Sequence, residues 1–241
     1  MLVFIGELGM TKKGSVFALL TKWEKLLWLL SVLVVLGTFL LFQSKDVLSL
    51  IASLIGVSAL IFVSTGQVFG QVLIIIFAVL YGIASLRFRY YGEMITYLGM
   101  SAPMAICALV SWIRHPYKDK SSVEVGSVSK KQAILMCVSG ILVTVAFYFI
   151  LGAFNTANLT VSTASVLTSF IASYLTFLRS PFYALAYAIN DVVLIVLWIL
   201  ATISDPSVLP MIFCFVMFLV NDLYGFFNWC RMRNRQASEG E

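Results

Sequence analysis

The sequence predicts an all-α, polytopic membrane protein of about eight transmembrane helices. Hydrophobic residues make up 61% of the 241 residues, charged residues make up only 11%, and the mean hydropathy is +1.00. Soluble domains contain roughly 45–50% apolar residues. The apolar residues are gathered into runs, each close to the ~20 residues that a helix needs to cross a bilayer.

Eight such runs follow a first segment that mixes lysines with apolar residues. That segment, residues 1–25, suits a basic amphipathic helix on an anionic lipid surface, or equally an unstructured tail. Pro103 lies inside the fourth run, where it predicts a kink. The runs are Leu26–Phe42, Val47–Ser64, Val68–Leu86, Met94–Ile113, Ile134–Phe154, Val161–Leu178, Phe182–Ile203 and Val208–Trp229.

The basic residues predict how the helices are oriented. With eight spans, 13 of the 16 Lys and Arg residues fall on the side that holds both termini. The positive-inside rule therefore predicts that both termini are cytoplasmic. The net charge of +5 then reflects topology and lipid headgroup contacts, and we expect no nucleic-acid partner.

A constant shift of 117 residues aligns two parts of the chain without a gap. The shift places Trp112-Ile113-Arg114 on Trp229-Cys230-Arg231, and Tyr81 on Trp198. Each part holds three runs and a single run lies between them, so both groups of three have the same orientation. The predicted segments are the N-terminal segment 1–25, an extra transmembrane helix 26–43, a first three-helix repeat 47–113, a linker helix 134–154, a second three-helix repeat 161–230 and a cytoplasmic tail 231–241.

Two Asn-Asp pairs, Asn190-Asp191 and Asn221-Asp222, lie near the middle of the last two runs. These runs are antiparallel neighbours, so we expect both pairs at a similar depth, where a carboxylate is costly unless it faces a cavity or a partner. Amides flanked by aromatic side chains suit a pocket for a flat, hydrogen-bonding ring. The candidate substrate-binding residues are Asn190, Asp191, Asn221, Asp222, Asn228, Trp198, Trp229, Tyr187, Tyr224 and Gln71.

Other interpretations of these polar residues stay open. Asn and Asp could hold neighbouring helices together, or Asp191 and Asp222 could take up a proton in a proton-coupled carrier. Two aspartates at one depth also raise an intramembrane aspartyl protease, although each follows asparagine rather than the Gly-x-Gly of that class. The sequence contains no Gly-x-x-x-x-Gly-Lys-Ser/Thr motif, one histidine and four widely spaced cysteines, so we expect no cofactor, no metal and no catalytic residues.

Three stretches resemble the PnuC family of bacterial vitamin transporters, and the resemblance covers roughly residues 47–231. The stretches are Tyr90-Tyr91-Gly92-Glu93 through Trp112-Ile113-Arg114, Ala186-Tyr187-Ala188-Ile189-Asn190 leading to Trp198, and Asn221-Asp222-Leu223-Tyr224-Gly225-Phe226-Phe227-Asn228-Trp229. One departure is Tyr183-Ala184-Leu185-Ala186, which stands where the family often has Trp-x-x-Trp.

The resemblance implies a SWEET-like fold of three, one and three helices and a homo-oligomer such as a trimer. It also implies facilitated diffusion of nicotinamide riboside, which a cytoplasmic kinase then phosphorylates and so traps. By position, the pocket would be lined or supported by Asn190, Trp198, Asn221, Tyr224, Asn228 and Trp229. Similar transporters of thiamine, riboflavin or deoxynucleosides keep the choice of substrate open.

Overall fold

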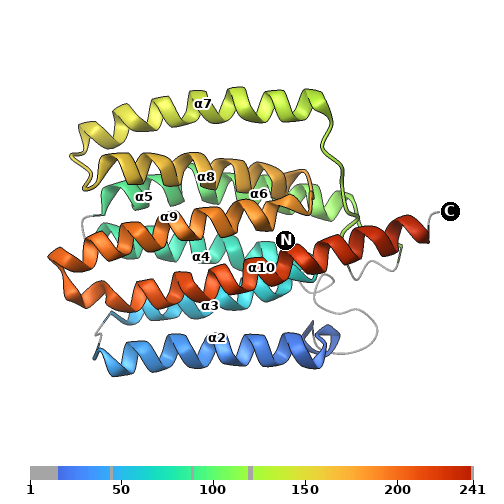
Figure 1. The fold of residues 1–241 in the computed structure, drawn as a ribbon, viewed down its shortest axis with the longest axis horizontal. Coiled ribbons are helices and arrows are strands. Elements are labelled where there is room, and N and C mark those ends of the chain that lie inside the picture. Colours follow the sequence, from blue (N-terminus) through green and yellow to red (C-terminus); the bar gives the residue numbers. More distant parts are fainter. Residues whose placement is uncertain (1–15, 44–45, 88–89, 119–121, 240–241) are drawn as a thin grey trace.

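A computed structural model describes residues 16–43, 46–87, 90–118 and 122–239 as a bundle of long helices (Figure 1). Within these residues, eight helices are long and apolar enough to cross a membrane, which confirms the predicted all-α fold. One span, Tyr91–Arg114, combines α5, η2 and α6. The elements are η1 (Val16–Leu19), α2 (Lys22–Leu41), α3 (Val47–Ser64), α4 (Val68–Arg87), α5 (Tyr91–Thr96), η2 (Tyr97–Ser101), α6 (Ala102–Arg114), α7 (Lys130–Ala153), α8 (Leu159–Phe177), α9 (Phe182–Ser204), η3 (Pro206–Val208) and α10 (Leu209–Ser238).

Two helices begin four residues earlier than the apolar runs, because each starts with a capping box. At the start of α2, Thr21 Oγ1 accepts the N–H of Glu24 over 3.3 Å, and Glu24 Oε2 accepts the N–H of Thr21 over 2.6 Å. Ser129 and Gln132 form the same arrangement at the start of α7. The spacing Thr-x-x-Glu and Ser-x-x-Gln is visible in the sequence and marks these starts.

The two ends of the chain differ from the predicted segments. Most of the predicted N-terminal segment 1–25 lies outside the described residues, and its last part, from Lys22, belongs to α2. The predicted tail 231–241 is a continuation of α10 as far as Ser238. The division into segments otherwise stays a prediction.

The irregularity predicted at Pro103 is a π-helical turn, Tyr97–Ser101. The N–H of Ala102 reaches back to the carbonyl of Tyr97. Proline has no N–H, and its ring crowds the carbonyl four residues earlier, so a wider turn before Pro103 relieves the crowding. The turn projects Tyr97 into the bundle, where its side chain is buried.

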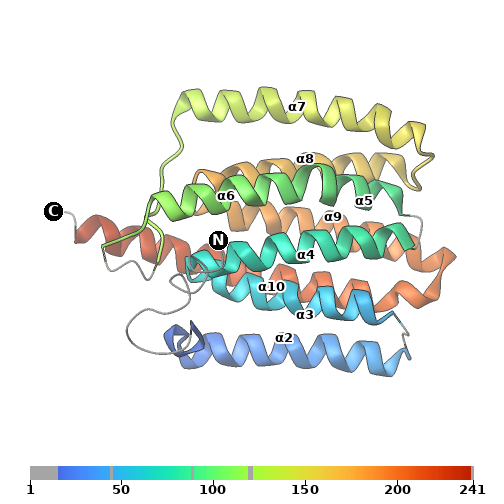
Figure 2. The ribbon, with the colours of Figure 1, turned by 180° about the vertical axis from the view of Figure 1, so that it is seen from behind.

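Figures 1 and 2 show two groups of three spans that run in the same direction. The first group consists of α3, α4 and the α5–α6 segment, and the second of α8, α9 and α10. Helices α3 and α8 point one way, α4 and α9 the other, and the α5–α6 segment and α10 the first way again. Helix α2 packs on α3 and α10 at one edge of the bundle, and α7 packs on α8 at the other (Figure 2). Between these edges, α3, α4, α9 and α10 form the centre.

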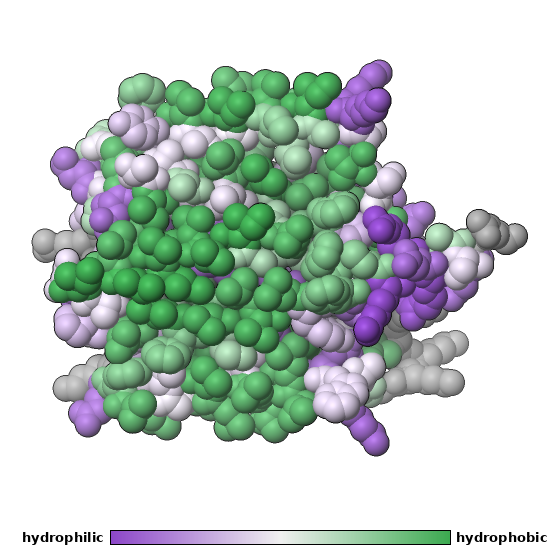
Figure 3. Space-filling view, in the orientation of Figure 1, coloured by the Kyte–Doolittle hydropathy of each residue, from purple (hydrophilic) through white to green (hydrophobic). Residues whose placement is uncertain are grey.

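Both described chain ends lie at one end of the bundle, which we call the basic end. Figure 3 shows a broad hydrophobic face across the helices, with hydrophilic residues gathered at the ends, most densely around the last turns of α10. Among the described residues, Arg87 is the one Lys or Arg at the opposite end. The basic end carries Lys22, Lys25, Arg114, Lys118, Lys130, Lys131, Arg179, Arg231, Arg233 and Arg235.

Two tryptophans exchange equivalent hydrogen bonds between the two groups of helices. The indole N–H of Trp112 on α6 donates to the carbonyl of Thr176 on α8 over 2.9 Å. The indole N–H of Trp229 on α10 donates to the carbonyl of Val63 on α3, also over 2.9 Å. The donors are 117 residues apart, which is the shift found in the sequence.

The residues just before the tryptophans repeat this exchange. Ser111 Oγ donates to the carbonyl of Phe177 over 2.7 Å, and Asn228 Nδ2 donates to the carbonyl of Ser64 over 2.9 Å. Each group thus supplies a polar residue and a tryptophan that bind the end of the other group's first helix. This reciprocity is what a two-fold relation between parallel repeats requires, and it supports the predicted repeat.

Candidate functional site

A central cavity of about 60 Å³ lies between the two groups of helices. Residues from α3, α4, η2, α8, α9 and α10 line it, so each group contributes one side. Its wall is aromatic and apolar with a few polar groups, as in most small-molecule sites. The lining residues are Gly56, Leu60, Val63, Gln71, Ile74, Phe77, Ala78, Tyr97, Ser101, Ser169, Thr176, Tyr183, Tyr187, Asn190, Asp191, Phe215, Phe218 and Asp222.

Asn190 is held in the cavity wall by α8. Its Oδ1 accepts hydrogen bonds from Thr168 Oγ1 over 2.8 Å and from Ser169 Oγ over 2.9 Å. Among the described residues, its amide N–H groups make no hydrogen bond, so they are available to a ligand acceptor in the cavity. The side chain is therefore oriented by two donors before a ligand arrives, which reduces the entropy lost on binding.

Asp191 and Asp222 come from neighbouring helices, α9 and α10, and their carboxyl groups interact with each other. Both residues are buried, with 3% and 4% of their surfaces exposed. Within the described part of the chain, Asp191 Oδ2 has no hydrogen-bond partner. The prediction that the two Asn-Asp pairs lie at one depth is therefore right for their aspartates.

The first group of helices adds one amide and one phenol to the cavity. Gln71 on α4 is buried, and its Nε2 has no partner among the described residues. Tyr97 enters from the π-helical turn. Opposite them, the hydroxyl of Tyr187 lies 2.9 Å from Ser173 Oγ, which fixes the Tyr187 ring against α8. The cavity thus combines ring surfaces with free amide donors and a carboxyl pair.

Two layers of aromatic side chains close the cavity. Towards the basic end, the rings of Trp112 and Trp229 lie 5.3 Å apart, and Tyr183 packs edge-on against Trp229 at 5.0 Å. Towards the opposite end, Trp198 donates its indole N–H to the Tyr81 hydroxyl over 3.1 Å. Ligand pockets usually measure ~300 Å³ or more, so the central cavity of this closed arrangement would have to widen to hold a ligand of that size.

Comparison with known proteins identifies the family. The family model described as nicotinamide mononucleotide transporter matches residues 46–231, more than three quarters of the chain. The chain belongs to the nicotinamide mononucleotide transporter family. A protein named nicotinamide riboside transporter PnuC, from Neisseria mucosa, is 24% identical over 217 residues, which cover 88% of this chain and 82% of that protein.

A crystal structure titled the vitamin B3 transporter PnuC has the same fold. The TM-score is 0.78 at 23% sequence identity, and the match covers 90% of this chain and 94% of that one. Membership of the nicotinamide mononucleotide transporter family makes this chain a multi-pass membrane transporter of a small molecule and not an enzyme. The predicted PnuC resemblance is confirmed, and the protease interpretation is dropped.

Of the ten predicted binding residues, five line the central cavity of this family member: Gln71, Tyr187, Asn190, Asp191 and Asp222. Trp198 lies beyond the closing layer, in a small cavity of about 20 Å³ near the opposite end. Trp229 is fully buried in the other closing layer. The structure therefore separates Asp222, which lines the central cavity, from Trp229, although both belong to the stretch Asn221–Trp229 in the sequence.

Asn221 and Tyr224 face helix α2 instead of the cavity. Asn221 Nδ2 donates to Ser31 Oγ over 2.9 Å, and the Tyr224 hydroxyl donates to Glu24 Oε1 over 2.8 Å. Trp28 adds a third polar contact on the same face of α2, because its N–H donates to Ser58 Oγ on α3 over 3.0 Å. In this conformation the two predicted site residues hold the extra N-terminal helix on the bundle.

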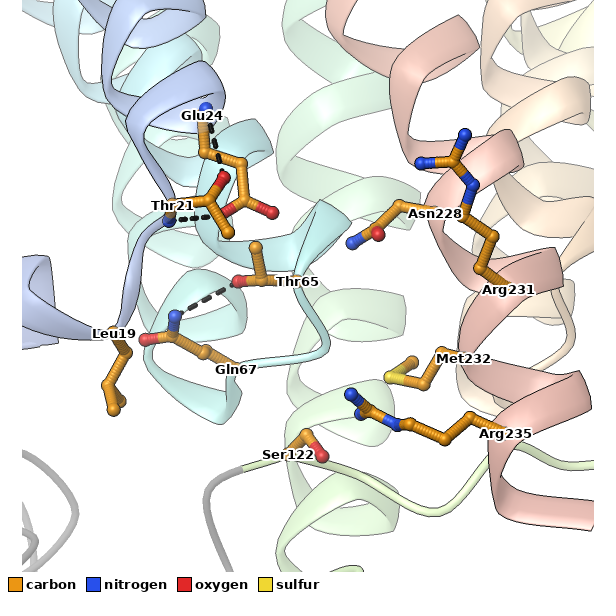
Figure 4. Close-up of a pocket in the computed structure, with 10 residues that line it drawn as sticks. All are labelled: Leu19, Thr21, Glu24, Thr65, Gln67, Ser122, Asn228, Arg231, Met232 and Arg235. Carbon is orange, nitrogen blue, oxygen red and sulfur yellow. Dashed lines mark hydrogen bonds between the residues drawn. The ribbon is translucent and has the colours of Figure 1, made fainter. Parts of the chain in front are cut away.

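Asn228 lines a wider cavity at the basic end, with a volume of about 530 Å³ (Figure 4). The wall combines the 65–67 turn, the start of α2 and the last turns of α10. In the close-up, Asn228 and Arg231 face Thr65 and Glu24 across the opening. The other residues are Leu19, Thr21, Gln67, Ser122, Met232 and Arg235.

The contribution of α8 to the site was not predicted from the sequence. Ser162, Ser165, Ser169, Ser173 and Thr176 are all buried on the face of α8 that turns to α9. Their spacing of three and four residues is visible in the sequence as a polar stripe in an apolar run. Hydroxyls at this spacing indicate a helix that positions polar partners, as Ser169 does for Asn190 and Ser173 for Tyr187.

Proposed function

We propose that this transporter mediates facilitated diffusion of nicotinamide riboside across a bacterial inner membrane. The observation that carries the proposal is the central cavity, where amide donors, phenol rings and a carboxyl pair meet between two groups of helices of the same orientation. The name of the Neisseria mucosa relative supports the choice of substrate.

The cavity suits the parts of nicotinamide riboside. Tyr97 and Tyr187 offer ring surface for the pyridine ring. The free N–H groups of Asn190 and Gln71 would donate to the carboxamide or ribose oxygens, and the Asp191–Asp222 pair would accept from ribose hydroxyls. Among the described lining residues no Lys or Arg occurs, so a phosphate group would meet carboxyls without a basic partner. The nucleoside therefore fits better than its 5′-phosphate.

The remaining predicted residues would act at other stages of transport. Trp198 and Asn228, in the cavities at the two ends, would meet the substrate as it enters or leaves. Trp229 would act through the closing layer, and Asn221 and Tyr224 through the docking of α2. Rocking of one group of helices against the other would open the two aromatic layers in turn.

Orientation and assembly complete the proposal. The basic end would face the cytoplasm, together with both termini, because the positive-inside rule places Lys and Arg there. The chain would form a homo-oligomer such as a trimer, which mass measurement in detergent can check. A cytoplasmic kinase would phosphorylate the nucleoside, and the phosphate would prevent its return through a cavity without basic side chains.

Calorimetric titration of the purified full chain with nicotinamide riboside tests this function. We expect binding that weakens at least about tenfold in Asn190→Ala, because the oriented amide is lost. Asn234→Ala, on the exposed last turns of α10, is the matched control and should bind normally. Absence of binding, or unchanged affinity when Asn190→Ala and Asn221→Ala are combined, would contradict the proposal. Competition with nicotinamide mononucleotide, thiamine, riboflavin and deoxynucleosides ranks the alternatives.

A proton-coupled carrier is the second candidate, favoured by the paired carboxyls of Asp191 and Asp222 and the unpartnered Asp191 Oδ2. Such a pair can hold one proton and release it when the surroundings change. Uptake into liposomes with an imposed pH gradient decides between the candidates. A response that disappears in Asp191→Asn and Asp222→Asn supports coupling, and indifference to the gradient removes it.

A further inference from the structure

The buried ionisable side chains in the described part of this protein are all acidic. Among the described residues, the charged side chains that are buried are Glu24, Glu93, Asp191 and Asp222, and no Lys, Arg or His joins them. Glu24 caps α2 and accepts from Tyr224, so its charge has a local structural role. The other three carboxyl groups line the two cavities between the groups of helices.

Glu93 is the carboxyl group that the packing explains least. It lies on α5 with 3% of its surface exposed and lines the small cavity near the opposite end. Neither Oε1 nor Oε2 has a hydrogen bond of good geometry within the described part of the chain, and the Tyr81 hydroxyl is the polar group that interacts with this carboxyl group. Gly92 permits this position, because a methyl group there would collide with Thr156 Cγ2 on the far wall. The acid is thus held in a closely packed wall with a phenol beside it, and no Lys, Arg or His is among the described residues that line its cavity.

Two aromatic side chains line the Glu93 cavity on the side towards the centre of the bundle. Tyr90 and Trp198, also in the cavity wall, have ring centroids 5.2 Å apart. Behind them, Trp198 is joined to Tyr81 in the layer that closes the central cavity. A carboxyl group beside ring faces is the combination that binds organic cations, because both the charge and the ring electrons attract a positive group.

Burying a carboxyl group without a basic partner is costly, so an acid of this kind at bilayer depth is stabilised by a proton or by a cationic ligand. Glu93 lies in one cavity and the Asp191–Asp222 pair in another, and among the described residues no Lys, Arg or His lines either cavity. The pyridine nitrogen of nicotinamide riboside carries the ribose and is permanently positive. A ring of this kind cannot lose its charge by releasing a proton.

We propose that the path selects a permanently cationic ring, which Glu93 receives in the cavity near the opposite end and the Asp191–Asp222 pair then holds in the central cavity. This inference rests on the proposed function and adds the property by which the substrate is chosen. Charge, more than the carboxamide, would then separate nicotinamide riboside from neutral nucleosides of similar size.

The reduced dihydropyridine form of nicotinamide riboside tests the inference, because it is neutral and nearly identical in size and hydrogen-bonding groups. Titrations of the full chain with both forms should show at least about tenfold tighter binding of the cation, the effect of one nearby opposite charge. Glu93→Gln keeps the shape of the side chain and should reduce that ratio, Glu93→Asp should restore much of it, and Glu124→Gln, in an exposed loop, should leave it unchanged.

Equal binding of the two forms by the unaltered protein would overturn the inference, while leaving the proposed function in place. A ratio that Glu93→Gln does not change, in protein with an unaltered melting temperature, would overturn the role of Glu93. If neither form binds, the proposed function is wrong and titration with thiamine decides the inference. Binding of thiamine, a cation, would then support selection by charge, and its absence would overturn it.

Discussion

Trp198 donates its indole N–H to the hydroxyl of Tyr81 over 3.1 Å, and these two residues are equivalent positions of the two predicted repeats, 117 residues apart. Trp112 and Trp229, equivalent by the same shift, also meet, with ring centroids 5.3 Å apart. Equivalent residues can touch only close to the axis that relates the repeats. In the predicted repeat, the axis would therefore pass through both closing layers, with the central cavity on it between them.

Tyr81→Phe should loosen the closing layer near the opposite end. The variant removes the acceptor of the Trp198 N–H and leaves that donor buried, at a cost of about 1–3 kcal/mol to the closed conformation. A cysteine at Ala157, in the wall of the neighbouring cavity, should then react faster with a maleimide in protein whose native cysteines are replaced. Tyr148→Phe, on the exposed side of α7, is the control. Unchanged labelling would show that this hydrogen bond does not hold the layer closed.

A double-mutant cycle on Trp112 and Trp229 measures how strongly the two repeats are coupled at the basic end. Trp112→Phe and Trp229→Phe each remove one hydrogen bond between the repeats, so each should lower the free energy of unfolding by about 0.5–1.5 kcal/mol. The packed rings should add an interaction energy of about 0.5–1.5 kcal/mol. Denaturant unfolding in micelles provides the values. Strict additivity, or a loss in only one variant, would contradict the reciprocal arrangement.

Asn221 and Asn190 were indistinguishable in the sequence, and the structure predicts different effects for them. Asn221→Ala removes the bond to Ser31 on α2 and should lower the melting temperature while changing the affinity for nicotinamide riboside by less than about twofold. Asn190→Ala should instead weaken binding at least about tenfold, or ~1.4 kcal/mol. Paired calorimetry and thermal unfolding check both values. An affinity loss in Asn221→Ala as large as in Asn190→Ala would show that Asn221 takes part in binding the substrate.

The different roles of the two asparagines show what the sequence can predict. Helix number and the 117-residue repeat depend on local hydrophobicity and on residues that recur, such as Trp112 and Trp229, so both are visible in the sequence. Which face of α10 meets α2 depends on packing between segments about 190 residues apart. Sequence periodicity places Asn221 one position from Asp222 but does not say which of the two turns to the cavity.

Gly56 lies in the wall of the central cavity, where a larger side chain would narrow the space. Its substitution therefore tests whether the substrate binds there without changing any charged residue. A Cβ atom at Gly56 would overlap with Phe218 Cζ and lie 3.1 Å from Phe77 Cδ2, and all three residues line the cavity. Gly56→Ala should therefore push the Phe218 ring and weaken nicotinamide riboside binding by about tenfold, since overpacking typically costs 1–3 kcal/mol. Gly37→Ala on α2 is the matched control.

Nothing lies within 4 Å of a Cβ atom at Gly37, so Gly37→Ala should leave binding unchanged and raise the stability of α2 by up to ~1 kcal/mol. Calorimetric titration of the two variants, with thermal unfolding in the same detergent, separates a narrowed cavity from a damaged fold. Normal binding by Gly56→Ala would mean that the substrate does not enter between Phe77 and Phe218, and the site would then have to lie elsewhere on the axis.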